Sequence, residues 1–387
     1  MFTIKLFLSI IPIAIIALVM YKIDIDKEPK KVLKQIFISS IIVGLAGGLI
    51  SYFLVQYIDK LQFNSILVYN IVRYVFIVAF IEEVCKFIPA KLIGMEGKHH
   101  TSFYDTLLYF VFSGLGFACI ENIMYVMTFT VKTAFVRGLL SVPGHILFSV
   151  ILGIFIAQAN KEKLKNNNKT NEKSIIYTTL GFTIASITHA IFNIGLTLKV
   201  GVAKAIIVSI LYIIGIYVIF IIKETSKINN FYIKNDIFKI VLNIRYIKAN
   251  RNIIGIISSI IILLGLFNTF SVYTFVEKNI GIKYFLIILQ FIFILIILYK
   301  KKLKDKFKYS NTVNLIIYIL SIIIYIYLAN SFLNTNYKLD YGYTLILNGL
   351  IMQTLYYILG CIKINKKEII NNTSKEETKE EIDPEII

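Results

Sequence analysis

Ionisable side chains interrupt several apolar stretches of this 387-residue chain. They are Glu82, Glu83 and Lys86 in the first stretch, Glu121 with Asn122 in the second, His145 in the third, and His189 with Asn193 in the fourth. A charge at the centre of a membrane span costs about 2.5 kcal/mol or more on insertion scales, so such residues are rare without a role. Their presence in four consecutive apolar stretches indicates one functional site.

The types of these residues favour hydrolysis. Carboxylates and imidazoles can activate water, either directly as general bases or by holding a metal ion, and a remaining His or Asn can stabilise an oxyanion. The signatures of other hydrolases are absent, including His-Glu-x-x-His, Gly-x-Ser-x-Gly and Gly-x-Gly-Asp. A structural alternative stays open for part of the cluster, because Glu82 and Lys86 at i,i+4 could form an internal ion pair. That pair does not account for the other two carboxylates and both histidines.

The composition places these residues in a membrane protein. Hydrophobic residues make up 57% of the chain and charged residues 17%, and the mean hydropathy is +0.74. A water-soluble fold could not bury so many apolar side chains, so soluble enzyme classes are excluded. We predict an all-α polytopic transmembrane helical bundle of about eleven spans. They are expected near 2–21, 33–58, 73–92, 105–127, 138–159, 174–197, 203–222, 252–275, 281–299, 312–332 and 342–362.

The distribution of positive charge predicts the orientation of this bundle. The chain carries 41 Lys and Arg against 23 Asp and Glu, a formal charge of +18. Lysines gather in alternate connections, above all 22–34, 161–173, 223–251 and 300–308. Because such an excess marks the cytoplasmic side, the N-terminus is expected outside and the C-terminus inside. Contact with anionic membrane lipids explains these lysines, and nucleic-acid binding is not expected.

The chain divides near residue 223. Residues 1–222 form a predicted seven-span core that holds all the intramembrane ionisable residues, and a basic cytoplasmic linker follows at 223–251. Residues 252–362 form a four-span C-terminal membrane region, whose interior Asn and Gln residues favour hydrogen bonds between helices. The charged cytoplasmic tail, 363–387, has no apolar face and is expected to be disordered. The three cysteines lie in apolar segments and provide no disulfide framework.

The predicted topology brings the ionisable residues to a similar depth in the membrane. A rise of 1.5 Å per residue places the glutamate pair at 82–83 near the middle of its span. Glu121, His145 and His189 lie between the middle and the outer surface. We therefore expect one pocket that opens towards the outer leaflet.

The same residues fall in four short motifs. They are Glu82-Glu83-Val84-Cys85-Lys86, Glu121-Asn122-Ile123-Met124-Tyr125, the isolated His145 after Pro143-Gly144, and His189-Ala190-Ile191-Phe192-Asn193. In this order on consecutive helices, they resemble the motifs of the PrsW family of intramembrane proteases, distant relatives of the CAAX-processing, bacteriocin-processing proteases. The neighbouring Glu28-Pro29, Asp105 and Gly114-Leu115-Gly116-Phe117-Ala118 also match the family style. The resemblance covers about residues 1–222.

The resemblance implies an intramembrane endopeptidase of the bacterial plasma membrane that crosses the bilayer many times. Its substrate would be a single-span membrane protein such as an anti-sigma factor, cut at site 1 on the extracytoplasmic side. The family is often described as metalloproteases, which implies a divalent metal such as Zn²⁺. The candidate ligands are Glu83, Glu121, His145 and His189. A glutamate-dependent reaction without a metal stays open as the alternative.

The resemblance also implies roles for the site residues. Glu82 or Glu83 would activate water together with His145, and His189 with Asn193 would stabilise the tetrahedral intermediate. The supporting residues, which tune the site and balance its charge, would be Lys86, Glu121, Asn122 and Tyr125. Asn193 stands where the family often has Asp, and Asn is the poorer metal ligand of the two.

A function from another class is also compatible with these residues. A transport or binding protein without enzymatic activity could use the same buried cluster as a path for ions or protons. Cleavage of a partner that is lost in Glu82→Gln would favour the enzyme, whereas ion flux without cleavage would favour transport.

Overall fold

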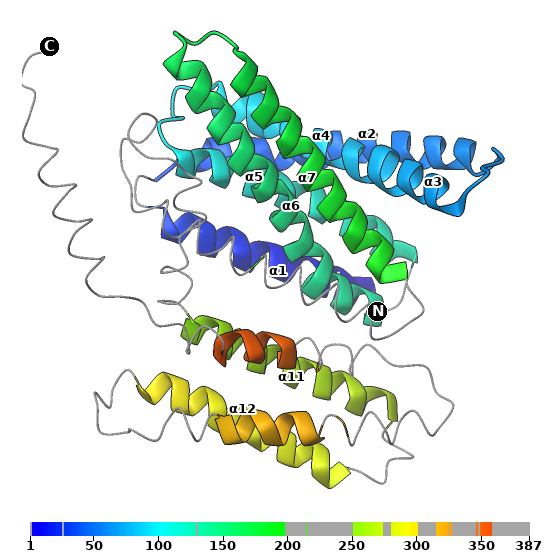
Figure 1. Ribbon diagram of the computed structural model, residues 1–387, viewed down its shortest axis with the longest axis vertical. Helices are drawn as coiled ribbons and strands as arrows, with labels where there is room; N and C mark the ends of the chain where they lie inside the picture. Colours follow the sequence, from blue (N-terminus) through cyan, green and yellow to red (C-terminus); the bar gives the residue numbers. More distant parts are fainter. Residues whose placement is uncertain are drawn as a thin grey trace, which may run out of the picture.

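The protein is described by a computed structural model that covers residues 2–24, 27–128, 131–197, 215, 251–273, 280–300, 315–324, 326, 346 and 349–357. Every element within these ranges is helical, as the sequence predicts (Figure 1). Five of the helices are long and apolar enough to cross a membrane. They are α1 (Phe2–Ile23), α2 (Lys30–Ile58), α5 (Phe103–Thr128), α6 (Val131–Lys165) and α7 (Glu172–Thr197).

These five helices coincide with predicted spans. The prediction near 73–92 falls on a more complex helical stretch, and the prediction near 203–222 lies outside the described residues, apart from residue 215. The linker at 223–251, except its last residue, and the tail at 363–387 also lie outside them. The number of eleven spans and the orientation of the termini stay predictions.

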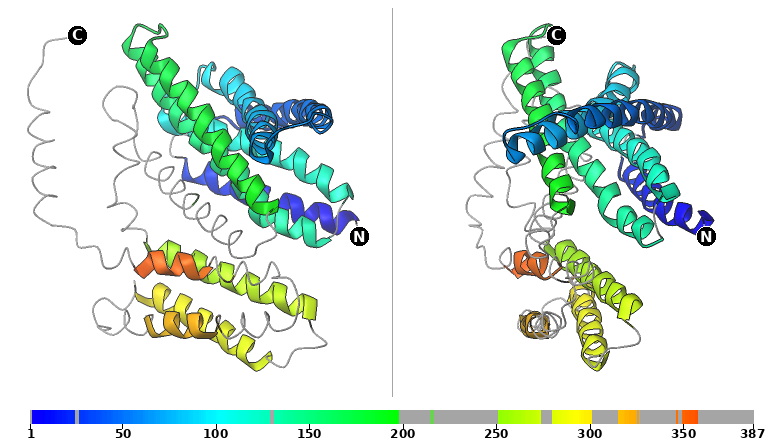
Figure 2. Two further views of the ribbon diagram at one scale, coloured as in Figure 1. Left: turned by 45° about the vertical axis from the view of Figure 1, so that its right-hand side comes forward. Right: turned by 90° about the vertical axis from the view of Figure 1, so that its right-hand side faces the viewer.

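One continuous helical stretch carries the glutamate pair. It consists of α3 (Ile66–Asn70), the π-helical segment η1 (Ile71–Ala79), α4 (Phe80–Pro89) and a second π-helical segment, η2 (Ala90–Met95). The wider π-helical turns are rare and often occur at functional sites, because they change which side chains share a face. The short helix α4 therefore lies between two π-helical segments. The beginning of this stretch lies beside α2, and the two extend beyond the other helices (Figures 1 and 2).

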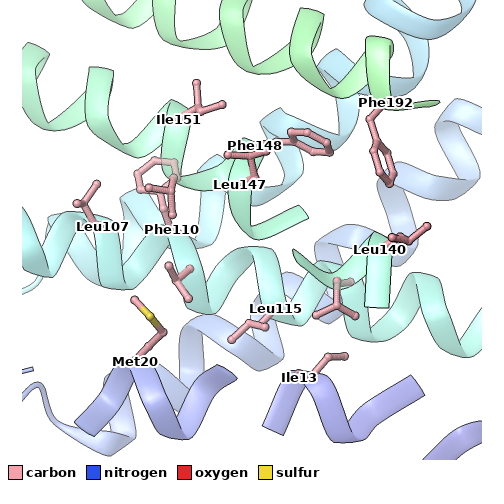
Figure 3. Packing of buried hydrophobic residues seen from close by; sticks show 14 of the residues in the cluster. Ile13, Met20, Leu107, Phe110, Leu115, Leu140, Leu147, Phe148, Ile151 and Phe192 are labelled. Atoms are coloured by element: carbon pink, nitrogen blue, oxygen red, sulfur yellow. The ribbon is translucent and has the colours of Figure 1, made fainter. Parts of the chain in front are cut away.

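Helices α5 and α6 form the interior of the bundle. Most of their apolar residues are buried, whereas α1 and α2 expose most of theirs, as expected for helices that face lipid. Leu107, Phe110 and Leu115 of α5 pack with Leu147 and Phe148 of α6 (Figure 3). The core of the N-terminal part is therefore built around the two helices that carry Glu121 and His145.

Glycines allow α5 to approach its neighbours closely. A Cβ atom at Gly116 would lie 2.3 Å from the backbone oxygen of Phe37 on α2, and one at Gly114 would lie 3.2 Å from the carbonyl oxygen of His145 on α6. Contacts below about 3.0 Å are too short for real atoms, so at Gly116 the helices could not keep this distance with a larger residue. The small residues thus set the position of α5 between α2 and α6.

Hydrogen bonds between helices reinforce this arrangement. The hydroxyl of Ser113 on α5 donates to the carbonyl oxygen of Lys86 on α4 over 2.6 Å, and the hydroxyl of Ser40 on α2 donates to the carbonyl oxygen of Ser113 over 2.6 Å. All three residues are fully buried. Serine hydroxyls commonly join membrane helices in this way. Ser113 thereby connects the glutamate-bearing helix to two others.

The C-terminal region contains a separate buried polar network. Helix α11 spans Arg251–Tyr273 and α12 spans Ile280–Lys300, and shorter helical segments lie at 315–324 and 349–357. The amide of Gln353 donates to Gln290 over 2.8 Å, and the amide of Gln290 donates to Ser321 over 2.9 Å. The expected hydrogen bonds between helices are confirmed for these two glutamines.

Gly116→Ala should destabilise the protein by about 1–3 kcal/mol, because the new methyl group must push α5 away from the backbone of α2. Thermal unfolding of the purified protein in detergent micelles measures this change. Gly48→Ala on α2 is the matched control, since its nearest neighbour would lie 3.7 Å away. Ala is the better helix former, so the control should be neutral or slightly more stable. Equal unfolding temperatures for the Gly116 variant and the wild type would contradict the close approach.

Glu28 is a buried carboxylate on the connection between α1 and α2. Its backbone N–H donates to Asp24 over 2.9 Å, its residue surface is 4% exposed, and its Oε2 has no hydrogen-bond partner in the described residues. Asp105, near the start of α5, accepts hydrogen bonds from the backbone N–H groups of Thr101 and Ser102. Burial, with repulsion from Asp105 and Asp24, raises the pKa of Glu28 to about 7.

Glu28→Gln should change how the stability of the protein depends on pH. Because the pKa of Glu28 is raised in the folded state, the protonated carboxyl favours folding, and this advantage is lost as the pH rises through 7. Gln cannot ionise, so the variant does not lose this stability. The difference in the free energy of unfolding between the variant and the wild type should therefore shift in favour of the variant between pH 5 and pH 8, by about 3 kcal/mol at most. Thermal unfolding at these pH values checks this. A constant difference between variant and wild type would contradict it.

Candidate active site

Three side chains from different helices converge at the centre of the bundle. Glu82 of α4, His145 of α6 and His189 of α7 each offer one ligand atom, and these atoms all lie within 4.8 Å of one another. Nε2 of His189 is 3.6 Å from Oε2 of Glu82, and the two imidazole rings lie 5.5 Å apart, centroid to centroid. Both histidines are buried. The predicted convergence of residues from separate spans is therefore present.

A carboxylate holds each imidazole from its other side. Nε2 of His145 is 2.5 Å from Oε2 of Glu121, and Nδ1 of His189 is 2.9 Å from Oε1 of Glu83. Such carboxylates select the tautomer of an imidazole and orient its ring, so that the remaining nitrogen can accept a bond. Nδ1 of His145 is buried and has no hydrogen-bond partner in the described residues. This nitrogen is therefore available.

Lys86 neutralises one of these carboxylates. Its ammonium group lies 2.6 Å from Oε1 of Glu83, and both side chains are completely buried. The ammonium also lies 5.0 Å from the centroid of the Phe117 ring, in a cation–π contact. The pair is i,i+3, so Lys86 binds Glu83 and not Glu82, the i,i+4 partner considered from the sequence.

Arg137 neutralises the carboxylate of Glu121. Its Nη2 lies 2.9 Å from Oε2 of Glu121, and its Nε donates to Oδ1 of Asn122 over 3.0 Å. The guanidinium group lies 3.7 Å from the centroid of the Tyr125 ring, while Nη2 also donates to Ser141. Arg137 comes just before the predicted span 138–159 and was not among the residues expected at the site. The spacing 137, 141 and 145 puts it on the same helix face as His145, and that spacing could have revealed it.

Glu82 is the one carboxylate of the group Glu82, Glu83 and Glu121 without an ion pair to Lys or Arg among the described residues. Its Oε2 is buried and makes no hydrogen bond, although His189 lies near it. With neutral histidines, the ion pairs Glu83–Lys86 and Glu121–Arg137 leave one net negative charge on the cluster. A buried carboxylate without compensation is costly, so this position would take up either a proton or a bound cation.

The donor set fits a divalent metal ion. Two imidazole nitrogens and one carboxylate oxygen form a ligand set of catalytic zinc sites, in which a fourth position is left for water or substrate. Oε2 of Glu82 and Nδ1 of His145 are buried without a hydrogen-bond partner, so both atoms could bind a metal ion. Carboxylates on the far nitrogens are the usual outer partners of such ligands.

The ligand group differs in part from the set expected from the sequence. His145 and His189 belong to it, but Glu82 takes the place of Glu83 and Glu121, which face the far nitrogens of the two imidazoles. In this arrangement Glu83 and Glu121 would be outer partners of the histidines, and the identity of the metal ligands stays a prediction.

The remaining predicted residues lie around this group. Asn122 is completely buried, and Tyr125 is 38% exposed beside Arg137. Asn193 is half-buried and lies one turn after His189.

Aromatic rings complete the walls of the site. The ring of Phe148 stacks on His189, with centroids 4.5 Å apart and planes 15° apart, and Phe117 lies 5.4 Å from His145. These contacts restrict the rotation of both imidazoles. From the sequence, Phe117 was noted only as part of the stretch Gly114 to Ala118, and Phe148 was not noted, because it is one of 29 Phe and lacks a distinctive spacing.

The site lies in a part of the chain that matches a known protein family. Residues 28–222 match the sequence profile of the PrsW family, described as intramembrane metalloproteases. This match covers half of the chain and includes every residue of the cluster. The chain belongs to the PrsW family. The resemblance of the four motifs is thereby confirmed.

Several relatives named Protease PrsW are similar to this member of the family. The protein from Oceanobacillus iheyensis is 29% identical over 139 residues, which is 36% of this chain and 60% of that protein. The protein from Clostridioides difficile is 30% identical over 196 residues, or 48% of this chain and 78% of that protein. The protein from Bacillus subtilis is 32% identical over 118 residues, or 30% of this chain and 51% of that protein. The chain thus spans between half and four fifths of these relatives, and no solved structure matches it.

Lys86→Met should destabilise the protein by about 3–5 kcal/mol, because Glu83 would be left buried without its cation. Thermal unfolding in detergent micelles measures the loss, and adding Glu83→Gln should restore part of it. Lys165→Met is a matched control, since Lys165 forms an i,i+3 pair with Glu162 over 2.8 Å but is 48% exposed. Its removal should cost less than about 1 kcal/mol. Similar losses of stability for the two single variants would show that burial does not raise the cost of breaking the Lys86–Glu83 pair.

Proposed function

We propose that this chain is an intramembrane endopeptidase that hydrolyses a peptide bond of a single-span membrane protein. The observation that carries the proposal is the convergence of Glu82 with two imidazoles, each anchored by a carboxylate. Membership of a metalloprotease family supports the same reaction. A structural polar network would not require an unpaired carboxylate or a free imidazole nitrogen.

Glu82, His145 and His189 would hold a divalent metal ion such as Zn²⁺. When bound, such an ion polarises the carbonyl group of the scissile bond and activates water at neutral pH. Glu83 and Glu121 keep the imidazoles in the tautomers that leave one nitrogen free. Lys86 and Arg137 balance the charges of these two outer carboxylates.

Two residues have direct roles towards the substrate. Glu82 has two carboxylate oxygens, so that one can hold a cation while the other takes a proton from the attacking water and passes it to the leaving amine. Asn193, one turn after His189, donates a hydrogen bond from its amide to the oxyanion of the tetrahedral intermediate. His189 instead serves as a metal ligand. Its Nδ1 is bound to Glu83, and its Nε2 faces Glu82 in the proposed ligand group.

The proposed substrate is a membrane-anchored protein such as an anti-sigma factor, cut at site 1 on the extracytoplasmic side of a bacterial plasma membrane. The resemblance of the motifs and the orientation expected from the lysine distribution support this side. Access to the site is supported by the partial exposure of Glu121 and Arg137 and by the exposed ring of Tyr125. A helical substrate would have to unwind locally to place its backbone beside Glu82.

Replacing the central residues should abolish cleavage while leaving the protein folded. Glu82→Gln, His145→Ala and His189→Ala should each lower the rate of cleavage by at least about 100-fold, because each removes a group needed for water activation. The measurement is cleavage of candidate single-span substrates, reconstituted with the full-length protein in liposomes. The matched control is Glu96→Gln, whose carboxylate is exposed and pairs with Lys91.

Metal removal tests separately whether the protein is a protease and whether its activity needs a metal ion. Treatment with a zinc chelator should stop cleavage by the wild type, and added Zn²⁺ should restore it. Cleavage that survives the chelator but not Glu82→Gln would support a glutamate-dependent protease without a metal. Ion flux through the liposomes without cleavage of any candidate would contradict the protease and favour an ion path.

A further inference from the structure

Arg137 joins several residues around Glu121 into one rigid unit. Its guanidinium contacts Glu121, Asn122 and Ser141 through hydrogen bonds and covers the ring of Tyr125. Three of these four partners, all but Ser141, are positions in the second PrsW-like motif, whereas Arg137 lies outside the four motifs. The planar group therefore organises a motif to which it does not belong.

Glu121 links Arg137 to His145 at the centre of the site. The same oxygen of Glu121, Oε2, receives Nη2 of Arg137 at 2.9 Å and faces Nε2 of His145 at 2.5 Å. A carboxylate that shares one oxygen between a guanidinium and an imidazole cannot move away from either group without losing a charge-assisted bond. The position of Glu121, and through it the rotation of the His145 ring, thus depends on Arg137.

We propose that Arg137 is a positioning residue, which holds Glu121 and through it the ring of His145, whose Nδ1 has no hydrogen-bond partner, beside Glu82 and His189. It acts on the ligand group from outside and is not itself a ligand. The inference rests on the proposed function for its consequence in catalysis, but the positioning of His145 can be measured without it. Lys could replace the charge of Arg137 but not the planar set of donors that binds Glu121 and Asn122 together.

The first readout is the affinity for Co²⁺, titrated into full-length protein in detergent micelles and followed by visible absorption. Arg137→Gln should weaken Co²⁺ binding by about 10–100-fold, the usual effect of losing an outer partner of a ligand. Arg137→Lys should recover only part of the loss. The double variant Glu121→Gln with Arg137→Gln should bind Co²⁺ no more weakly than Glu121→Gln alone, because both residues act on His145 through the same contact.

The chain offers a closely matched control in Arg73. This residue also binds a carboxylate, Asp59, over 2.8 Å and lies over a tyrosine ring, that of Tyr69, but it is remote in sequence from His145 and shares no contact with it. Arg73→Gln should leave Co²⁺ binding unchanged. Equal affinities of the wild type and Arg137→Gln, or equal losses in Arg73→Gln, would overturn the inference.

The second readout does not need a metal. The chain has four His, so ¹⁵N NMR of histidine-labelled full-length protein can resolve the ring nitrogens of His145, assigned by His145→Gln. Arg137→Gln should disturb the tautomer of His145, and Arg73→Gln should not. If the wild type binds no Co²⁺, the metal part of the proposed function fails, and this spectrum decides the inference alone. An unchanged His145 signal in Arg137→Gln would overturn it.

Discussion

The need to compensate buried negative charge governs the arrangement of the core. Glu82, Glu83 and Glu121 lie within a bundle of apolar helices, where a carboxylate without a partner is strongly disfavoured. Lys86 and Arg137 each neutralise one of them, and each brings aromatic contacts that hold the cation in place. One carboxylate, Glu82, is left over beside two histidines. The imbalance that makes the core costly is thus also what makes it suitable for a divalent cation.

The helices around this core are arranged so that these pairs can form. The close contacts of Gly114 and Gly116 bring α5 against α6 and α2, and the hydroxyl of Ser113 connects α5 to α4. Two π-helical segments flank α4. Stacking of Phe148 on His189 restricts the ring of the third proposed ligand. Helix packing therefore positions the site, because every proposed ligand lies on a helix.

The sequence predicts which residues belong to this site better than it predicts which of them pair with one another. Apolar run length and the four motifs identify the helices, both histidines and the three glutamates. They do not distinguish Glu82 from Glu83, because neighbouring helical residues point about 100° apart and the π-helical turns before them shift the face. Lys86 can reach either glutamate, at i+3 or i+4, and only the fold decides. Arg137 looked like part of a connection because its partner Glu121 lies on another helix.

X-ray absorption spectroscopy of the full-length protein loaded with Zn²⁺ tests whether Glu82, His145 and His189 hold one metal ion. If they do, the first shell contains two imidazole nitrogens and carboxylate or water oxygen at about 2.0–2.2 Å, and Glu82→Gln loses the bound zinc. A first shell that contains sulfur, for which Cys85 on α4 is the nearest candidate in sequence, would contradict this metal site. So would a shell with fewer than two imidazoles.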